Sequence, residues 1–206
     1  QLRPEYSYMK LESSHYDNNK GINILNASTG DCEYSIKLEE VLSFLVLSDP
    51  LDKTKINHCQ FSPAGNKVLF MLRTYRKDGK YSYLLTWNYE DNTLTRLMDD
   101  RVVSHYSWMS DKEIIVWGRI GLQTGYHTLN LNGDSIRLKC EDSLLLGDGH
   151  PSYSEQLQKV ITDTYPNKAR ISTIFLLGIK TAEEERLVQL HQPWKFNGSY
   201  RVDLHP

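Results

Sequence analysis

The sequence predicts an all-β fold of the propeller type, and two observations support this prediction. First, one unit recurs: a His, an aromatic residue shortly after it, a polar turn with Ser or Pro, and a run of β-forming residues. Second, each complete unit divides into four strand-like segments, and four strands in a period of about 40–50 residues are typical of a propeller blade. The histidines that open the units stand 47, 45 and 55 residues apart and are His58, His105, His150 and His205.

The clearest unit shows the four predicted strands in order. They are "HCQFS", "KVLFMLRTY", "YSYLLTWNY" and "LTRLM", with turns at "KDGK" and "EDNT". The Asp-Gly pair tolerates the positive φ of a tight hairpin, so this turn has a physical basis. The strands of the next unit are "HYSWM", "EIIVWGRI", "YHTLNL" and "SIRLKC", and those of the third are "HPSYS", "KVITDTY", "STIFLLGI" and "RLVQL".

The remaining segments fit the same scheme. "KGINILNASTGDCEYSI" reads as the last two strands of an earlier blade, and Lys37–Leu47 as a short helix inserted between blades. The chain is therefore expected to be one propeller portion of about four blades within a larger ring. Its expected parts are a partial blade with the insertion (1–50), three successive blades (51–100, 101–147 and 148–200) and the start of another blade (201–206).

Charge and cysteine content narrow the function classes. The net charge is −2 and the isoelectric point is about 6.4, whereas a nucleic-acid-binding domain usually carries a strongly basic stripe. No nucleic-acid partner is therefore expected. The longest apolar run, Val41–Leu47, is far shorter than the ~20 residues of a membrane span. Cys32, Cys59 and Cys140 form neither a disulfide framework nor a metal knuckle, which favours a reducing compartment, the cytoplasm, with the periplasm as the alternative.

The position of the histidines predicts a shared site. The first strand of each blade lines the central channel, so residues at equivalent places in successive blades form a ring there. His58, His105, His150 and His205 are therefore expected to meet at one mouth of the channel. Converging neutral imidazoles are good ligands for divalent Mn, Fe, Ni or Zn. The alternative is a structural role, in which each His hydrogen-bonds a neighbouring backbone within the blades.

Several motifs resemble known propellers. "HCQFSPAGNKVLF" and "GDGHPSYSEQLQKVITDTYP" resemble the "FSPDG"-type blades of TolB-like propellers. "SHYSW", "DGHPSYS" one blade later and the "HP" that ends the following inner strand are similar to the oligogalacturonate lyase group, seven-bladed propellers that cleave uronate polysaccharide fragments. The resemblance extends from about Lys20 onward, and it implies that the larger ring has seven blades.

The resemblance also implies roles for the histidines. In that group one channel histidine is the general base, and histidines from the next blades bind a divalent metal, usually Mn. By position, His105 would be the base and His150 and His205 metal ligands, with His58 in the same ring. The group has a Gln and a second His in the segment that ends at His205. Here the segment reads "YRVDLHP", so Asp203 is the substitute oxygen ligand and no Gln matches.

Arginines and tyrosines complete the candidate site. The group places an arginine near the base, for which Arg201 is the catalytic candidate, and Arg201 or Arg119 could hold a substrate carboxylate by two contacts. Tyr106 and Tyr165 are candidates to stack on a sugar, with packing inside the blades as the alternative for each. The predicted function is metal-assisted β-elimination of a uronide in an acidic oligosaccharide. The alternative is a non-catalytic propeller that binds a glycan or a protein.

Overall fold

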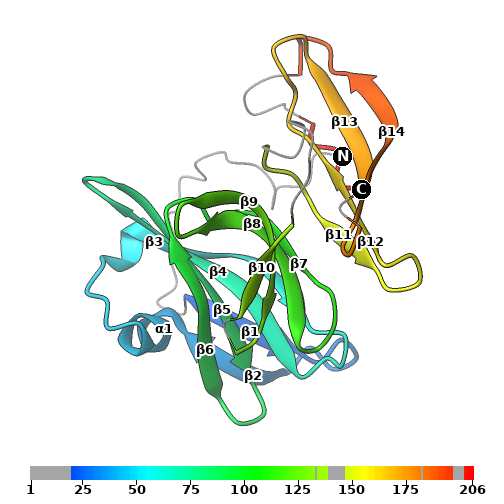
Figure 1. The fold of residues 1–206 in the computed structure, drawn as a ribbon. Helices are drawn as coiled ribbons and strands as arrows, with labels where there is room; N and C mark the ends of the chain where they lie inside the picture. The colour runs from blue at the N-terminus through cyan, green and yellow to red at the C-terminus, as the bar shows by residue number, and fades with distance from the viewer. Residues whose placement is uncertain (1–19, 133, 139–146, 182, 197–201) are drawn as a thin grey trace.

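The computed structural model describes residues 20–132, 134–138, 147–181, 183–196 and 202–206 (Figure 1). Three four-stranded antiparallel sheets follow one another along the chain, after one two-stranded sheet. Within each four-stranded sheet the strands lie side by side in sequence order. The predicted all-β class with about four blades is confirmed.

The strand bounds follow the predicted repeat closely. The two-stranded sheet contains β1 (Gly21–Leu25) and β2 (Cys32–Lys37), followed by the single short helix of the described residues, α1 (Leu38–Phe44), and by the 3-10 turn η2 (Leu51–Lys53). The first four-stranded sheet contains β3 (Thr54–Phe61), β4 (Lys67–Arg76), β5 (Gly79–Asn88) and β6 (Thr93–Asp100). The second contains β7 (Tyr106–Trp108), β8 (Glu113–Ile120), β9 (Gln123–Asn130) and β10 (Ser135–Arg137). The third contains β11 (Ser152–Ser154), β12 (Lys159–Asp163), β13 (Ile171–Gly178) and β14 (Glu184–His191).

Three hydrophobic clusters lie between consecutive sheets. The first joins β2 and α1 to β4 and β5, the second joins β4–β6 to β7–β9, and the third joins β8 and β9 to β12 and β13. Because β4 has a neighbouring sheet on both faces, it reads "KVLFMLRTYR", a nearly continuous buried run without polar alternation. The sheets therefore pack face to face, as propeller blades do, and their first strands follow one another along one side.

The aromatic residues that follow the histidines do not all pack alike. Trp108 is buried, and its Nε1 donates to the backbone oxygen of Gln60 at 3.2 Å in the preceding sheet. Phe61, at the equivalent place, is 55% exposed, so the expectation that it packs in a blade core is wrong. Its ring meets Tyr89 edge-on, on the side where the preceding sheet has only two described strands.

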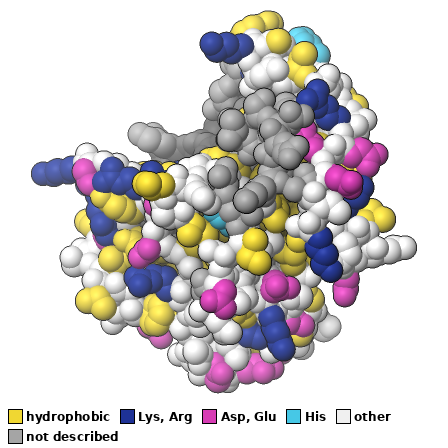
Figure 2. Space-filling view, in the orientation of Figure 1, with side chains coloured by type: hydrophobic (Ala, Val, Ile, Leu, Met, Phe, Trp, Pro, Cys, Tyr) yellow, Lys and Arg dark blue, Asp and Glu magenta, His cyan; other side chains and the backbone are white. Residues whose placement is uncertain are grey.

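Charged side chains of both signs lie on the surface. On the face shown in Figure 2, acidic and basic side chains are interspersed, without a stripe of one sign. Among the described residues no helix is long and apolar enough to cross a membrane.

Candidate functional site

The four repeat histidines form one continuous row. The ring centroids of His58 and His105 are 5.3 Å apart, those of His105 and His150 are 4.3 Å apart, and those of His150 and His205 are 3.7 Å apart. His58 lies in β3, whereas His105 directly precedes β7 and His150 lies two residues before β11. The structure therefore brings together side chains that lie about 50 residues apart in sequence, at the place the repeat predicts.

His105 is held by an aspartate from the next sheet. Its Nδ1 lies 3.0 Å from Oδ1 of Asp148, and the Ser104 hydroxyl donates to Oδ2 of Asp148 at 2.6 Å. A carboxylate beside Nδ1 favours the tautomer with the proton on Nδ1, which leaves the Nε2 lone pair available. His105 and Asp148 are both largely covered, with 14% and 20% of their side chains exposed. This arrangement suits a general base, because the ring is oriented and its second nitrogen can accept a proton.

His150 is held in the same way by Asp163. The His150 Nδ1 lies 2.9 Å from one carboxylate oxygen and 3.1 Å from the other, and its backbone N–H donates to Oδ1 at 2.7 Å. Burial alone would raise the pKa of Asp163, but the hydrogen bonds from His150 and from the backbone of Leu204 lower it. A metal-binding histidine commonly donates its other ring nitrogen to a carboxylate, which fixes the ring and raises its basicity.

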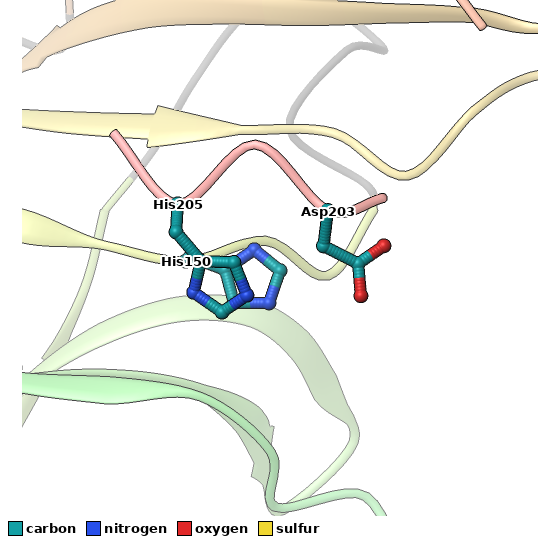
Figure 3. Close-up of side chains that lie close together, drawn as sticks. All are labelled: His150, Asp203 and His205. Atoms are coloured by element: carbon teal, nitrogen blue, oxygen red, sulfur yellow. The ribbon is translucent and has the colours of Figure 1, made fainter. Parts of the chain in front are cut away.

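The end of the row carries a group of possible metal ligands. His150, Asp203 and His205 each offer one ligand atom, and these atoms all lie within 4.8 Å of one another (Figure 3). The pKa of His205 is lowered, first by desolvation and then by the neighbouring His150, so its imidazole is neutral at pH 7. The rings of His150 and His205 are tilted by 31°. Binding one shared ion therefore requires the ring nitrogens to turn toward a common point.

His58 stands at the opposite end of the row. A β-bulge between Asn57 and Gln60 interrupts the pairing of β3 with β4, and His58 has a φ of 55° there. Although the residue is exposed at the surface, partial desolvation and then the nearby charges of His105 and Arg73 lower the pKa of His58 to about 4. The lowered pKa means that the imidazole of His58 is neutral at pH 7.

The two tyrosine candidates, Tyr165 and Tyr106, have different surroundings. The rings of Tyr165 and His105 are 6.3 Å apart and those of Tyr165 and His150 are 5.7 Å apart, so this side chain lines the row. Tyr106 is 4% exposed, and its hydroxyl donates to the backbone oxygen of His58 at 2.7 Å. The suggestion that Tyr106 binds substrate is therefore corrected: it is a packing residue that joins two sheets.

Of the two arginine candidates, the structure describes Arg119, whose guanidinium pairs with an aspartate. Arg119 donates to Asp100 through Nε at 3.1 Å and through Nη2 at 2.9 Å, so its guanidinium is already engaged. Arg201 lies outside the described residues. Arg170 donates to the backbone oxygens of Gln192 and Phe196.

Two supporting residues were missed by sequence reasoning. Ser104 directly precedes His105, but no local pattern shows that its hydroxyl meets Asp148 from the next sheet. Asp163 lies 13 residues after His150, and nothing in the local sequence shows that the two side chains meet.

A cavity of about 530 Å³ lies away from the histidines. It is lined by Lys20, Gly21, Leu38, Lys53, Thr54, Lys55, Ile56 and Tyr75. The candidate chemistry is therefore on an open row of side chains and not in this cavity.

Comparisons with known proteins identify the fold. No protein-family model matches the sequence, and no curated protein is similar to it. Among solved structures, TolB from Acinetobacter baumannii aligns with a TM-score of 0.55 at 13% identity, over 81% of this chain and 37% of that one. An oligogalacturonate lyase in complex with manganese aligns with a TM-score of 0.57 at 10% identity, over 84% and 48%. An acylaminoacyl peptidase from Pyrococcus horikoshii aligns with a TM-score of 0.50 at 13% identity, over 82% and 28%.

The chain has the β-propeller fold. At these identities the similarity shows the fold alone, and it confirms at that level the resemblance to TolB and oligogalacturonate lyase propellers. The chain spans less than half the length of each of these three structures.

Proposed function

We propose that this propeller chain carries the active site of a metal-assisted lyase, which cleaves an acidic oligosaccharide by β-elimination at a uronide. The observation that carries the proposal is the adjacency of two different histidine environments in one row. His105 is oriented with a free Nε2, and its neighbour His150 belongs to a group of three possible metal ligands. One of the similar folds is an oligogalacturonate lyase in complex with manganese, which supports the choice of reaction.

The residues present fit a divalent cation. His150, Asp203 and His205 provide two imidazoles and one carboxylate, a donor set that suits Mn²⁺ and similar ions. His150 has its Nδ1 on Asp163, so Nε2 is the nitrogen available for binding. When bound, the cation supplies neutralisation of the substrate carboxylate, whose charge otherwise opposes loss of the α-proton.

His105 removes the proton in the proposed reaction. Its Nε2 takes the proton from C5 of the uronide, next to the carboxylate, and the electrons of that bond form a C4–C5 double bond. The C4–O4 bond breaks as this double bond forms, and the leaving oxygen takes a proton from water. Asp148 stabilises the imidazolium that forms, because its carboxylate already contacts Nδ1. Tyr165 is placed to pack against the sugar ring beside His105 and His150.

The test combines metal content with product formation. The purified protein is loaded with Mn²⁺, its metal content is measured, and the absorbance of unsaturated uronides is followed on a panel of acidic oligosaccharides. His105→Gln is expected to keep the metal and lose about 10²–10⁴-fold in rate, which is the usual contribution of a general base. His205→Ala is expected to lose metal and activity together.

The matched control is His191→Gln, at the exposed end of β14, the outermost strand of the third sheet. It is expected to change neither measurement. If the wild-type protein binds no divalent metal and yields no absorbance on any acidic glycan, the lyase proposal is wrong. That outcome would favour a propeller that binds a glycan or a protein without chemistry, since the segment ending at His205 also lacks the Gln and second His of the lyase group.

A further inference from the structure

One arginine near the histidine row has no partner. Every other arginine whose side chain the structure describes pairs with a carboxylate or donates to backbone oxygens. Arg73, in β4, has no hydrogen bond or ion pair within the described part of the chain, and its Nε is fully buried. A buried guanidinium N–H without an acceptor is unfavourable, and it indicates that something outside the described residues accepts from it.

A second unpartnered polar atom stands directly opposite. Arg73 of β4 pairs in register with Ser82 of β5, so the two side chains share one face of the sheet. The Ser82 Oγ is also buried without a hydrogen-bond partner among the described residues. The Arg73 guanidinium and the Ser82 hydroxyl can both donate hydrogen bonds, so together they are complementary to a single acceptor with several oxygens.

A further cation lies on the same face. Lys80 is two residues before Ser82 in β5, and it pairs with Tyr75, so it is the diagonal neighbour of Arg73. The same face carries Met71 and Leu84, which pack against the second sheet beside Tyr106. The face therefore looks toward the second sheet.

Arg73 and Lys80 also interact electrostatically with groups of the histidine row. Desolvation lowers the pKa of His58 most, followed by the charges of His105 and Arg73. The charge of Arg73 also lowers the pKa of Tyr106, which burial raises. Desolvation and then the charge of Arg73 lower the pKa of Lys80, while Asp148, the partner of His105, raises it. Arg73 thus lies within electrostatic range of His58, and Lys80 lies within electrostatic range of Asp148.

We infer that Arg73, Ser82 and Lys80 form an anion-binding subsite for a ligand carboxylate, next to His58 and His105. The planar guanidinium matches the two oxygens of a carboxylate, the serine hydroxyl adds a third donor, and the lysine adds charge. The inference stands independently of metal binding and of lysis. Together with the proposed function, it places a second acidic group of the oligosaccharide at the His58 end of the row, opposite the metal group.

Binding of simple anions to metal-free protein tests the inference. The full chain is treated with a chelator and titrated with glucuronate, inorganic phosphate and neutral glucose, and binding is followed by NMR shifts of the Ser82 and His58 resonances. Glucuronate is expected to bind and glucose is not. Arg73→Met is expected to weaken glucuronate binding at least about tenfold, and Arg73→Lys to restore only part of it, because the planar fork is lost.

Stability measurements separate binding from folding. Arg73→Met is expected to leave the melting temperature unchanged or to raise it, since it removes an unsatisfied buried group. A large drop in melting temperature would show that Arg73 is structural and would overturn the inference. Arg96→Met, whose arginine pairs with Asp99 on the outer strand β6, is the matched control and is expected to change neither binding nor melting.

The remaining outcomes are decisive as well. Phosphate that binds as tightly as glucuronate, with the same loss in Arg73→Met, keeps the subsite but assigns it to oxyanions in general. Anion binding that is equal in wild type and Arg73→Met, or absent from the wild type, means that water alone satisfies these groups and overturns the inference. The lyase proposal survives that result, because its own test depends on metal and His105.

Discussion

At His105 and His150, the same chemical arrangement occurs twice with different consequences. Each ring has a carboxylate on Nδ1, from Asp148 in one case and Asp163 in the other. Among the described residues, His150 belongs to the group of possible metal ligands with Asp203 and His205, whereas His105 does not. The same device, a carboxylate that fixes the tautomer, can therefore prepare one histidine to accept a proton and the next to bind an ion.

Asp148→Asn tests the orienting role. The asparagine keeps the shape of the side chain but no longer favours a proton on Nδ1, because its amide can present N–H₂ to the ring. We expect His105 to populate both tautomers, and the lyase rate to fall about 10²-fold or more. The tautomer is measured from the ¹⁵N shifts of the His105 ring. An unchanged tautomer and rate would show that Asp148 does not position the base.

His58 makes stability depend on pH. Its pKa is about 4 in the folded protein and about 6.5 in an unfolded chain, so the unfolded state binds more protons between these values. The stability that neutral His58 contributes is fully present above about pH 6.5 and is lost as pH falls toward 4. The lowered pKa of His205 acts in the same direction. His58→Gln is expected to flatten the free energy of unfolding across pH 4–6.5, measured by urea titration, and an identical slope would contradict this.

At the scale of single elements, the inner strands present their histidines by different local means. β3 has a bulge that places His58 at a positive φ, whereas His105 and His150 precede the short strands β7 and β11. The segment before β11 passes so close to β12 that a Cβ on Gly149 would lie 1.9 Å from the backbone oxygen of Asp163. Only glycine permits this approach, and the approach is what lets the His150 N–H reach the Asp163 carboxylate.

Gly149→Ala therefore should disturb the site through the backbone. The added methyl group forces the two segments apart, and we expect a loss of about 1–3 kcal/mol in stability, as for an overpacked site, together with weaker metal binding. Gly147→Ala is the control, because a Cβ there meets nothing within 4 Å. Chemical denaturation and metal titration measure both effects. Equal stability of the two variants would contradict the close approach.

At the scale of the whole molecule, the sheets are joined through their faces. The hydrophobic clusters lie between sheets, and a few buried hydrogen bonds cross the same interfaces. Tyr126 of β9 and Thr162 of β12 share a hydrogen bond of 2.7 Å, with both residues at most 2% exposed. Such contacts set the relative position of successive inner strands, and hence the spacing of the histidine row.

Replacing one partner of this bond should cost more than replacing both. Tyr126→Phe leaves the Thr162 hydroxyl buried and unsatisfied, so we expect a loss of about 1–3 kcal/mol. Tyr126→Phe combined with Thr162→Val removes both polar groups and is expected to be less destabilised than the sum of the single variants. Equilibrium denaturation measures the cycle, with Tyr34→Phe at an exposed tyrosine as the control. Strict additivity would show that the bond does not couple the sheets.

Much of the architecture was predictable because it is local. The four-strand repeat, the hairpin turns and the short helix after β2 each depend on neighbouring residues, and all were predicted within a few residues of their bounds. The meeting of four histidines was also predictable, since a radial repeat brings equivalent positions together. The packing role of Tyr106 and the exposure of Phe61 were not, because each depends on which sheet covers that face.

The sequence by itself determined the repeat, the strands within it and the positions from which histidines enter one shared row. These features depend on residue patterns that recur at a regular spacing along the chain. Tertiary structure alone decided which histidine receives which carboxylate and which ligand atoms meet Asp203. It also decided that Arg73 and Ser82 face each other without partners, while Arg119 is occupied by Asp100. The physical reason is that these contacts join different strands and sheets, where side-chain direction and packing, and not sequence spacing, select the partner.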